Sequence, residues 1–315
     1  MEEKKYKLLK DETLEDAYGR KLYRIEALRD FGDVRVGDKG GFVESEQNLS
    51  HNGNCWVYDG AMVCDNAKVS GNAKVGGCAK VYDYAEVRYC AEVYDYAEVH
   101  DYVEVNDYAE VYGNAKLYDY AKVWGNSEVC GNAKVCDNAE VYDRAEVHGY
   151  TKVYNNAEVW GNAKVFGNAK IWGNAEVHNN AEVYDNAKVR GYAEVRDNAE
   201  VYNNAEVYDD AKVRGYAEVG GYAKVCGNSE VRGNAEVCGK AKVRGNEDYI
   251  VFKNWWSSGR NFTWTRSNNK WRVGCFYGTG DELIKKAYAD SEKSGREYER
   301  VVKYVESILK DDEQK

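Results

Sequence analysis

The sequence predicts a mainly β protein whose chain winds into a solenoid of short strands. From Val57 to Val243 every sixth residue is aliphatic, which gives 32 positions without an insertion or deletion. A small residue, nearly always alanine, stands two positions before almost every one of them. Each unit closes on a pair such as Asp-Asn, Gly-Asn or Asn-Asn, and these residues favour turns. An internal repeat of this regularity indicates a repetitive architecture before any other argument.

The six-residue period decides between strand and helix. In an extended segment the small and the aliphatic residue face the same side, because side chains alternate. The residues flanking the aliphatic one, usually Glu or Lys before it and Tyr, Trp, His or Arg after it, face the other side. On an α-helix, residues six apart would be turned by about 600° and would spread around its surface. Each unit is therefore a short strand and a corner, and a chain of such units coils into a solenoid.

The repeat resembles that of left-handed parallel β-helices, in which an aliphatic residue is followed by three variable residues, a small residue and another variable one. The resemblance covers about 190 of the 315 residues. It extends to unlooped hexapeptide-repeat proteins of bacteria and their phages, which often carry the name putative transferase. It implies that three hexapeptides form one triangular coil of 18 residues, so that 32 units make about 10–11 coils.

Residues 1–54 lie outside the repeat register. We expect them to form an N-terminal β cap, because the open end of a solenoid must be covered. Segments 6–9 and 21–25 alternate like strands around the turn-like stretch 16–19, and 34–43 looks like a degenerate first coil.

The predicted β-helix domain covers residues 55–246, and a small α+β domain is expected at 247–315. Its expected strands are 249–256, 262–265 and 271–276, and its expected helices are 281–288 and 297–309. Four tryptophans of this domain are expected in its core: Trp255, Trp256, Trp264 and Trp271. Arg260, in the loop 257–260 beside them, is a candidate contact residue.

Composition bounds the function classes. The formal net charge is −10 and the pI about 5.2, so the whole chain has no general attraction to nucleic acid or anionic membrane. No signal peptide opens the chain, and no segment is apolar enough to span a bilayer. Nine cysteines without a CxxC motif favour reduced thiols and a cytoplasmic location.

Stacking the repeat with three hexapeptides to a coil sorts its outward charges into columns, one basic and two acidic. The basic column carries eight lysines in ten positions, and its candidate binding residues are Lys116, Lys134, Lys152, Lys170 and Lys188. Like charges in neighbouring strands repel. Duplication of whole coils with screening by solvent explains the column without a function, whereas a charged partner would give it one.

Aromatic residues follow two of these columns. Beside the lysines stand Tyr118, Tyr154 and Trp172, and a second column carries Trp124, Tyr142 and Trp160. Basic residues interleaved with aromatics are typical of surfaces that bind phosphate-bearing ligands. An exposed aromatic ladder can also be the seam of a homo-oligomer, a dimer or trimer.

One corner stacks five aspartates: Asp65, Asp83, Asp101, Asp119 and Asp137. Such residues commonly stabilise turns, and evenly spaced carboxylates can also hold cations. Turn chemistry is the interpretation we favour, and no metal site is predicted. His100, His148 and His178 fall on three different faces, so within one chain they do not converge on a metal.

The leading hypothesis is a non-catalytic rigid scaffold that presents its charged and aromatic columns to a protein partner. The resemblance to phage proteins adds a host-factor-binding or anti-defence role. One alternative is an acyl-CoA-dependent acyltransferase, since enzymes with this repeat use a histidine and a loop that projects from the coils, yet no loop interrupts the 32 units. The other is a nucleic-acid or nucleotide binder acting through the lysines. The enzyme question leans to no, and no catalytic residue or cofactor is predicted.

Overall fold

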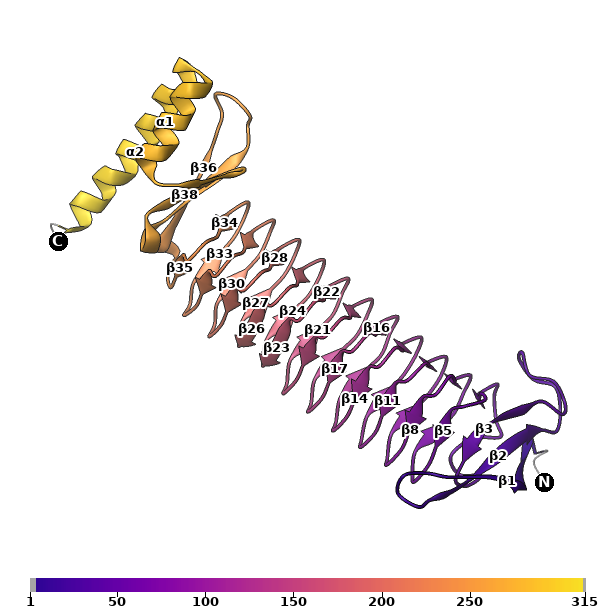
Figure 1. Cartoon of the computed structure of the whole chain (residues 1–315). Helices are drawn as coiled ribbons and strands as arrows, with labels where there is room; N and C mark the ends of the chain where they lie inside the picture. Colours follow the sequence, from indigo (N-terminus) through magenta and orange to yellow (C-terminus); the bar gives the residue numbers. More distant parts are fainter. Residues whose placement is uncertain (1–3, 314–315) are drawn as a thin grey trace. The chain divides into compact units, whose positions relative to one another are not determined.

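The computed structural model describes residues 4–313 and falls into two compact units, Met1–Gly191 and Tyr192–Lys315. The prediction of a mainly β parallel solenoid is confirmed in both. Counted along the chain, the 32 short strands β4–β35, three to a coil, make about 11 coils. Figure 1 shows them as arrows on successive turns of the chain.

The first unit opens with the expected β cap. Strands β1 (Tyr6–Glu15) and β2 (Lys21–Ala27) pair antiparallel. The Asp16 carboxylate closes their turn by accepting the backbone N–H groups of Tyr18 and Arg20, both at 2.9 Å. β3 (Lys39–Val43) pairs antiparallel with β2 and parallel with β5, so the chain enters the first coil there.

Three parallel sheets line the coils of the first unit, and almost every strand consists of one polar or charged residue and one aliphatic residue. The basic sheet contains β5 (Met62–Val63), β8 (Lys80–Val81), β11 (Glu98–Val99), β14 (Lys116–Leu117), β17 (Lys134–Val135), β20 (Lys152–Val153), β23 (Lys170–Gly173) and β26 (Lys188–Gly191). The acidic sheet contains β4 (Trp56–Val57), β7 (Lys74–Val75), β10 (Glu92–Val93), β13 (Glu110–Val111), β16 (Glu128–Val129), β19 (Glu146–Val147), β22 (Lys164–Val165) and β25 (Glu182–Val183). The mixed sheet contains β6 (Lys68–Val69), β9 (Glu86–Val87), β12 (Glu104–Val105), β15 (Lys122–Val123), β18 (Glu140–Val141), β21 (Glu158–Val159) and β24 (Glu176–Val177).

The register confirms the expected coil length of three hexapeptides. Lys116 pairs with Lys134, and Glu110 pairs with Glu128. Backbone bonds join the coils; for example, the N–H of Lys134 donates to the carbonyl of Thr151 at 3.0 Å. The inward alanines and valines are fully buried, so each coil contributes six small or branched side chains to one continuous core.

The corners explain why Asp, Asn and Gly close the hexapeptides. Most corners place one residue in the left-handed region, as at Asp83 (φ 58°) and Gly131 (φ 69°). Gly reaches this region without strain, and Asp and Asn tolerate it better than other residues. Each hexapeptide therefore combines a two-residue strand with a corner residue in the left-handed region, which only a few residue types tolerate.

The second unit begins with three shorter sheets of the same type. Their strands are β29 (Glu206–Val207), β32 (Lys224–Val225) and β35 (Lys242–Val243); β28 (Glu200–Val201), β31 (Glu218–Val219) and β34 (Glu236–Val237); and β27 (Glu194–Val195), β30 (Lys212–Val213) and β33 (Glu230–Val231). Paired residues again lie one coil of three hexapeptides apart, as for Glu200 and Glu218.

The predicted α+β domain follows in this unit. An antiparallel sheet is formed by β36 (Tyr249–Lys253), β37 (Asn261–Thr265), β38 (Lys270–Val273) and β39 (Phe276–Gly278). Short 3-10 turns lie at η1 (Asn246–Asp248) and η2 (Arg266–Asn268), and two helices follow, α1 (Gly280–Asp290) and α2 (Glu292–Glu313). Thr279 and Glu282 form a capping box at the start of α1. No helix among residues 4–313 combines the length and apolar character that crossing a bilayer requires.

Two expectations for this domain are wrong. The predicted strand 271–276 is two strands, because Gly274 (φ 54°) reverses the chain between β38 and β39. Trp256, Trp264 and Trp271 lie in the core with Phe262, as expected, but Trp255 is 70% exposed. The strand that should have buried it ends at Lys253.

Candidate binding surface

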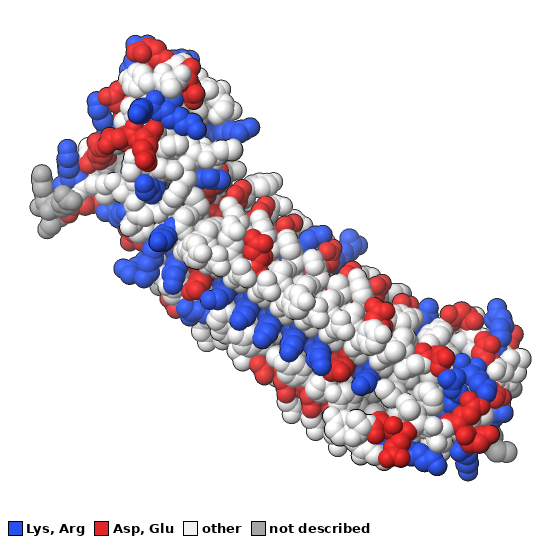
Figure 2. All heavy atoms as spheres, in the orientation of Figure 1, with Lys and Arg blue, Asp and Glu red and all other residues white. Residues whose placement is uncertain are grey.

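The lysines of the basic sheet form the most regular charged feature of the first unit. Lys116, Lys134, Lys152, Lys170 and Lys188 lie directly opposite one another on five consecutive strands, β14 to β26. We call these five residues the lysine column. Figure 2 shows a row of basic side chains along this side of the coils, where Figure 1 labels β14, β17, β23 and β26.

The middle of the lysine column lacks counter-charges. Lys116 pairs with Glu98 of the preceding coil at 2.5 Å. For Lys134, Lys152 and Lys170, no carboxylate of the described chain lies within the 4.0 Å of an ion pair. Parallel strands lie about 4.8 Å apart, so three ammonium groups follow one another without an ion-pair partner.

Lysines on the other two sheets are placed differently. Lys122 of the mixed sheet pairs with Glu140 at 3.6 Å. On the acidic sheet, Lys164 pairs with Glu146 at 3.1 Å and Lys74 with Glu92 at 3.3 Å. Each of these pairs joins neighbouring coils, so a glutamate of an adjacent coil can neutralise a lysine on these two sheets.

An aromatic column runs beside the lysine column, one position further along each strand. Tyr154 and Trp172 stack at 5.7 Å, and Arg190 lies 6.0 Å from the ring of Trp172. Cys136 interrupts the stack between Tyr118 and Tyr154. Its hydrogen bond with Tyr118 is the main cause that raises the pKa of that phenol, followed by burial. Because the rings cover one another, mainly their edges face solvent.

The second aromatic column lies on the mixed sheet. Trp124 and Tyr142 stack at 4.5 Å, and Tyr142 and Trp160 at 5.9 Å. The Tyr142 hydroxyl donates to Glu158 at 2.8 Å. The predicted binding residues therefore do not form one surface. Eight belong to the basic sheet and three to the mixed sheet, while Arg260 is an exposed loop residue of the second unit.

A groove on the mixed sheet was not predicted from the sequence. It has a volume of about 610 Å³ and is lined by Glu86, Arg88 and Glu104 along with a third ladder of rings. That ladder contains Tyr84, Tyr102 and Tyr120, which stack at 4.9 and 5.0 Å and are half exposed. A tyrosine recurring at the same corner of successive coils was the available signal.

The aspartate corner has the turn role that the sequence favoured. Asp83, Asp101, Asp119 and Asp137 all have positive φ, between 57° and 60°. Each carboxylate accepts the backbone N–H one coil further on; Asp101 does so from Asp119 at 3.1 Å. These bonds fix the carboxylates in a row along the edge of the basic sheet.

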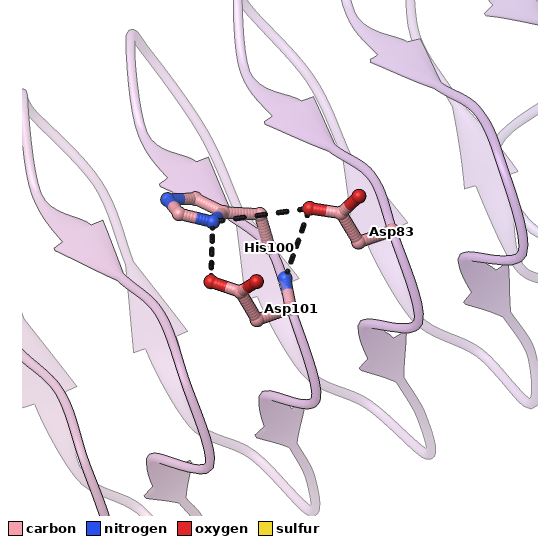
Figure 3. A group of neighbouring side chains, drawn as sticks. All are labelled: Asp83, His100 and Asp101. Atoms are coloured by element: carbon pink, nitrogen blue, oxygen red, sulfur yellow. Dashed lines mark hydrogen bonds and ion pairs between the residues drawn. The ribbon is translucent and has the colours of Figure 1, made fainter.

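Two of these corners also hold a further metal-ligating side chain. His100 lies between Asp83 and Asp101, with its Nδ1 atom 2.8 Å from Asp101 and 4.0 Å from Asp83 (Figure 3). Two coils further on, Cys136 occupies the same position between Asp119 and Asp137. The expectation that histidines from different faces do not converge on a metal did not consider the aspartates around a single histidine.

Comparison with known proteins adds a short match. No family model matches the chain. A segment of 38 residues is 47% identical to a protein of Escherichia coli (strain K12) named "Uncharacterized acetyltransferase YdcK". The match covers 12% of this chain and 12% of that relative, so it spans a small part of both. The name of that relative agrees with the name putative transferase that hexapeptide-repeat proteins often carry.

Proposed function

We propose that this protein is a non-catalytic scaffold whose lysine column binds an acidic surface of a protein partner. The observation that carries the proposal is the run of Lys134, Lys152 and Lys170 without an ion-pair partner in the described chain. Their alignment across successive coils gives a rigid, regularly spaced row of positive charge.

The energetic argument is that the fold does not need this row. Like charges directly opposite one another destabilise a sheet by about 0.2–1 kcal/mol per pair. The pairs Lys122–Glu140 and Lys164–Glu146 illustrate the more stable alternative on the neighbouring sheets. A partner that supplies carboxylates would offset the repulsion and gain from steered association.

A protein partner suits the surroundings better than a nucleic acid does. Nucleic-acid binding surfaces commonly offer open ring faces for base stacking, but Tyr154 and Trp172 stack on each other. The chain also carries a net charge of −10, which repels a long polyanion beyond the lysine column. The resemblance to phage proteins makes a host factor or a defence protein the partner class to examine first.

The test compares the full chain with two charge-matched double variants as baits in a bacterial lysate. Lys134→Glu with Lys152→Glu inverts the lysine column. Lys122→Glu with Lys164→Glu makes the same change in net charge on the other two sheets. We expect a specific protein to be retained by the wild type and the second variant and lost with the first, after nuclease treatment.

The outcomes separate the alternatives. Equal retention by both double variants would overturn the assignment to the lysine column. Retention that disappears with nuclease, and that weakens steeply with salt, would favour nucleic-acid binding instead. Circular dichroism of each variant confirms that the coils are intact.

Acetyl transfer is the second candidate, and the partial match to the protein named acetyltransferase supports it. Between residues 57 and 191 the strands recur every six residues and no loop projects between them to enclose a substrate. Under our proposal acetyl-CoA leaves the melting temperature of the full chain unchanged. A concentration-dependent rise in melting temperature would favour the enzyme.

A further inference from the structure

We propose that Asp83, His100 and Asp101 form a binding site for one divalent transition-metal ion of the zinc class. The site joins two coils, because Asp83 belongs to the coil before that of His100 and Asp101. This inference is independent of the lysine column and of any partner.

The ligand atoms are already gathered. The Nδ1 atom of His100 and one carboxylate oxygen from each aspartate all lie within 4.8 Å of one another. A zinc ion about 2.0–2.2 Å from each ligand requires ligand atoms roughly 3–3.6 Å apart. The separation of 2.8 Å to Asp101 and 4.0 Å to Asp83 brackets that range. Small side-chain rotations therefore place all three around one ion.

The imidazole is held in place by its neighbours. Its ring stacks on Tyr82 at 4.7 Å and on Tyr118 at 5.6 Å, with interplanar angles of 10° and 9°. Figure 3 shows the ring edge turned toward the two carboxylates. A ligand fixed in this way loses little conformational freedom on binding an ion.

The turn role of the aspartates does not account for the histidine. Asp107 and Asp143 accept the corresponding backbone N–H groups at other corners, at 3.2 and 3.3 Å, without a histidine beside them. No lysine or arginine in residues 4–313 lies within ion-pair distance of Asp83 or Asp101. Two carboxylates with one imidazole thus form a site whose negative charge a divalent cation would neutralise.

The same arrangement recurs two coils further on, at a distance of about 10 Å. There Cys136 takes the position of His100, and its sulfur lies within 4.8 Å of Asp119 and Asp137 oxygens. Nitrogen, sulfur and carboxylate ligands together suit zinc rather than magnesium or calcium. A thiol must lose its proton to bind the metal, so this second set is the weaker one at neutral pH.

A bound ion would keep at least one coordination position that no protein ligand fills. Three protein ligands leave room for at least one water molecule or anion, as in exposed zinc sites. His100, Asp83 and Asp101 are all partly exposed, so solvent can reach the ion. Bridging two coils, the ion would also reduce the repulsion along the aspartate row.

The experiment uses the untagged full chain, stripped with a chelator and titrated with ZnCl₂ by calorimetry. The informative variants preserve structure while removing ligands. His100→Phe keeps a ring between Tyr82 and Tyr118, and Asp101→Asn keeps both the corner conformation and the acceptor oxygen. We expect each to weaken the tighter binding event by roughly tenfold or more, and Cys136→Ser to remove the weaker event.

His148→Phe is the matched control. His148 stacks on Phe166 in the same manner, but Gly149 follows it where Asp101 follows His100. Its zinc affinity should equal that of the wild type. The proposal is overturned if the wild type does not bind zinc, or if His100→Phe binds as tightly as His148→Phe does.

Discussion

The basic and mixed sheets of the first unit are alike inside and different outside. Val135 of the basic sheet and Val141 of the mixed sheet are both fully buried and pair with valines of the next coil. Outside, Lys134 lies opposite lysines on both sides, whereas Glu140 lies opposite Lys122 on one side and Glu158 on the other. The same backbone therefore carries two different charge layouts.

This difference separates what the fold requires from what it permits. The core and the corners restrict residue type, because the interior is narrow and the corner backbone is left-handed. The outward strand position accepts either sign of charge. A run of like charges at that position is then evidence of a use outside the fold, which is the basis of the proposed partner surface.

The largest expected effect tests whether buried positions of the basic and mixed sheets are equally sensitive to a buried charge. Val135→Asp and Val141→Asp each bury an unpaired carboxylate in a fully enclosed position, and each should lower the free energy of unfolding by about 3 kcal/mol or more. Urea denaturation measures this. Lys134→Asp, the outward neighbour, is the control and should stay within about 1 kcal/mol of the wild type. A large difference between the two valine variants would break the comparison.

A smaller effect is expected at the corners that precede the two sheets. The corner before β17 uses Gly131 (φ 69°), and the corner before β18 uses Asp137 (φ 57°). A Cβ atom at Gly131 would come within 2.9 Å of the backbone nitrogen of Gly149. Gly131→Val should cost about 1–2 kcal/mol or more, because a β-branched residue is strained at positive φ.

Gly131→Asn serves as the control for this corner. Asp95 and Asp185 stand in the same column with positive φ, so the asparagine should be tolerated much better than the valine. Thermal denaturation compares the two. If both variants lost the same stability, steric crowding rather than backbone conformation would limit this corner.

The solenoid could be predicted from the sequence because each hexapeptide determines its own conformation. The inward valines, the left-handed corners and the pairing of Lys116 with Lys134 all follow from one repeated unit. The end domain has no such repetition. Trp255 was expected in the core, but the chain turns there, where the Gly259 N–H donates to the Asn254 carbonyl at 2.7 Å.

The candidate sites were predictable to the extent that they follow single columns. The lysine column and the stack of Trp124 on Tyr142 each lie on one sheet. The cluster around His100 combines an outward column with a corner column, so its residues stay apart when the repeat is sorted by single columns. Ion pairing of individual lysines depends on side-chain reach across coils, which the repeat alone does not give.

Reversing one outward charge should change the stability only slightly, and with opposite sign on the basic and mixed sheets. Lys152→Glu places a carboxylate between Lys134 and Lys170, and should raise the stability by about 0.2–1 kcal/mol while weakening partner binding. Lys122→Glu, which removes the pair with Glu140 and places a carboxylate between Glu104 and Glu140, should lower it by a similar amount. Both changes should shrink at high salt, as followed by melting temperature. Destabilisation by Lys152→Glu would mean that the lysine column has a structural role.

The smallest effect concerns stacked carboxylates in the second unit. Glu218 lies between Glu200 and Glu236, and burial, followed by the charges of Glu236 and Glu200, raises its pKa above the usual 4.5. The folded state then binds a proton at Glu218 more tightly than the unfolded chain does, so the contribution of this group to wild-type stability falls as the pH rises from 4.5 through the raised pKa. Glutamine does not titrate, so Glu218→Gln removes this pH-dependent loss of stability. The variant should match the wild type below pH 4.5 and exceed it by only a few tenths of a kcal/mol at pH 7. Melting temperatures across this range measure the difference, and a constant offset at every pH would show that side-chain packing, not charge, distinguishes the two proteins.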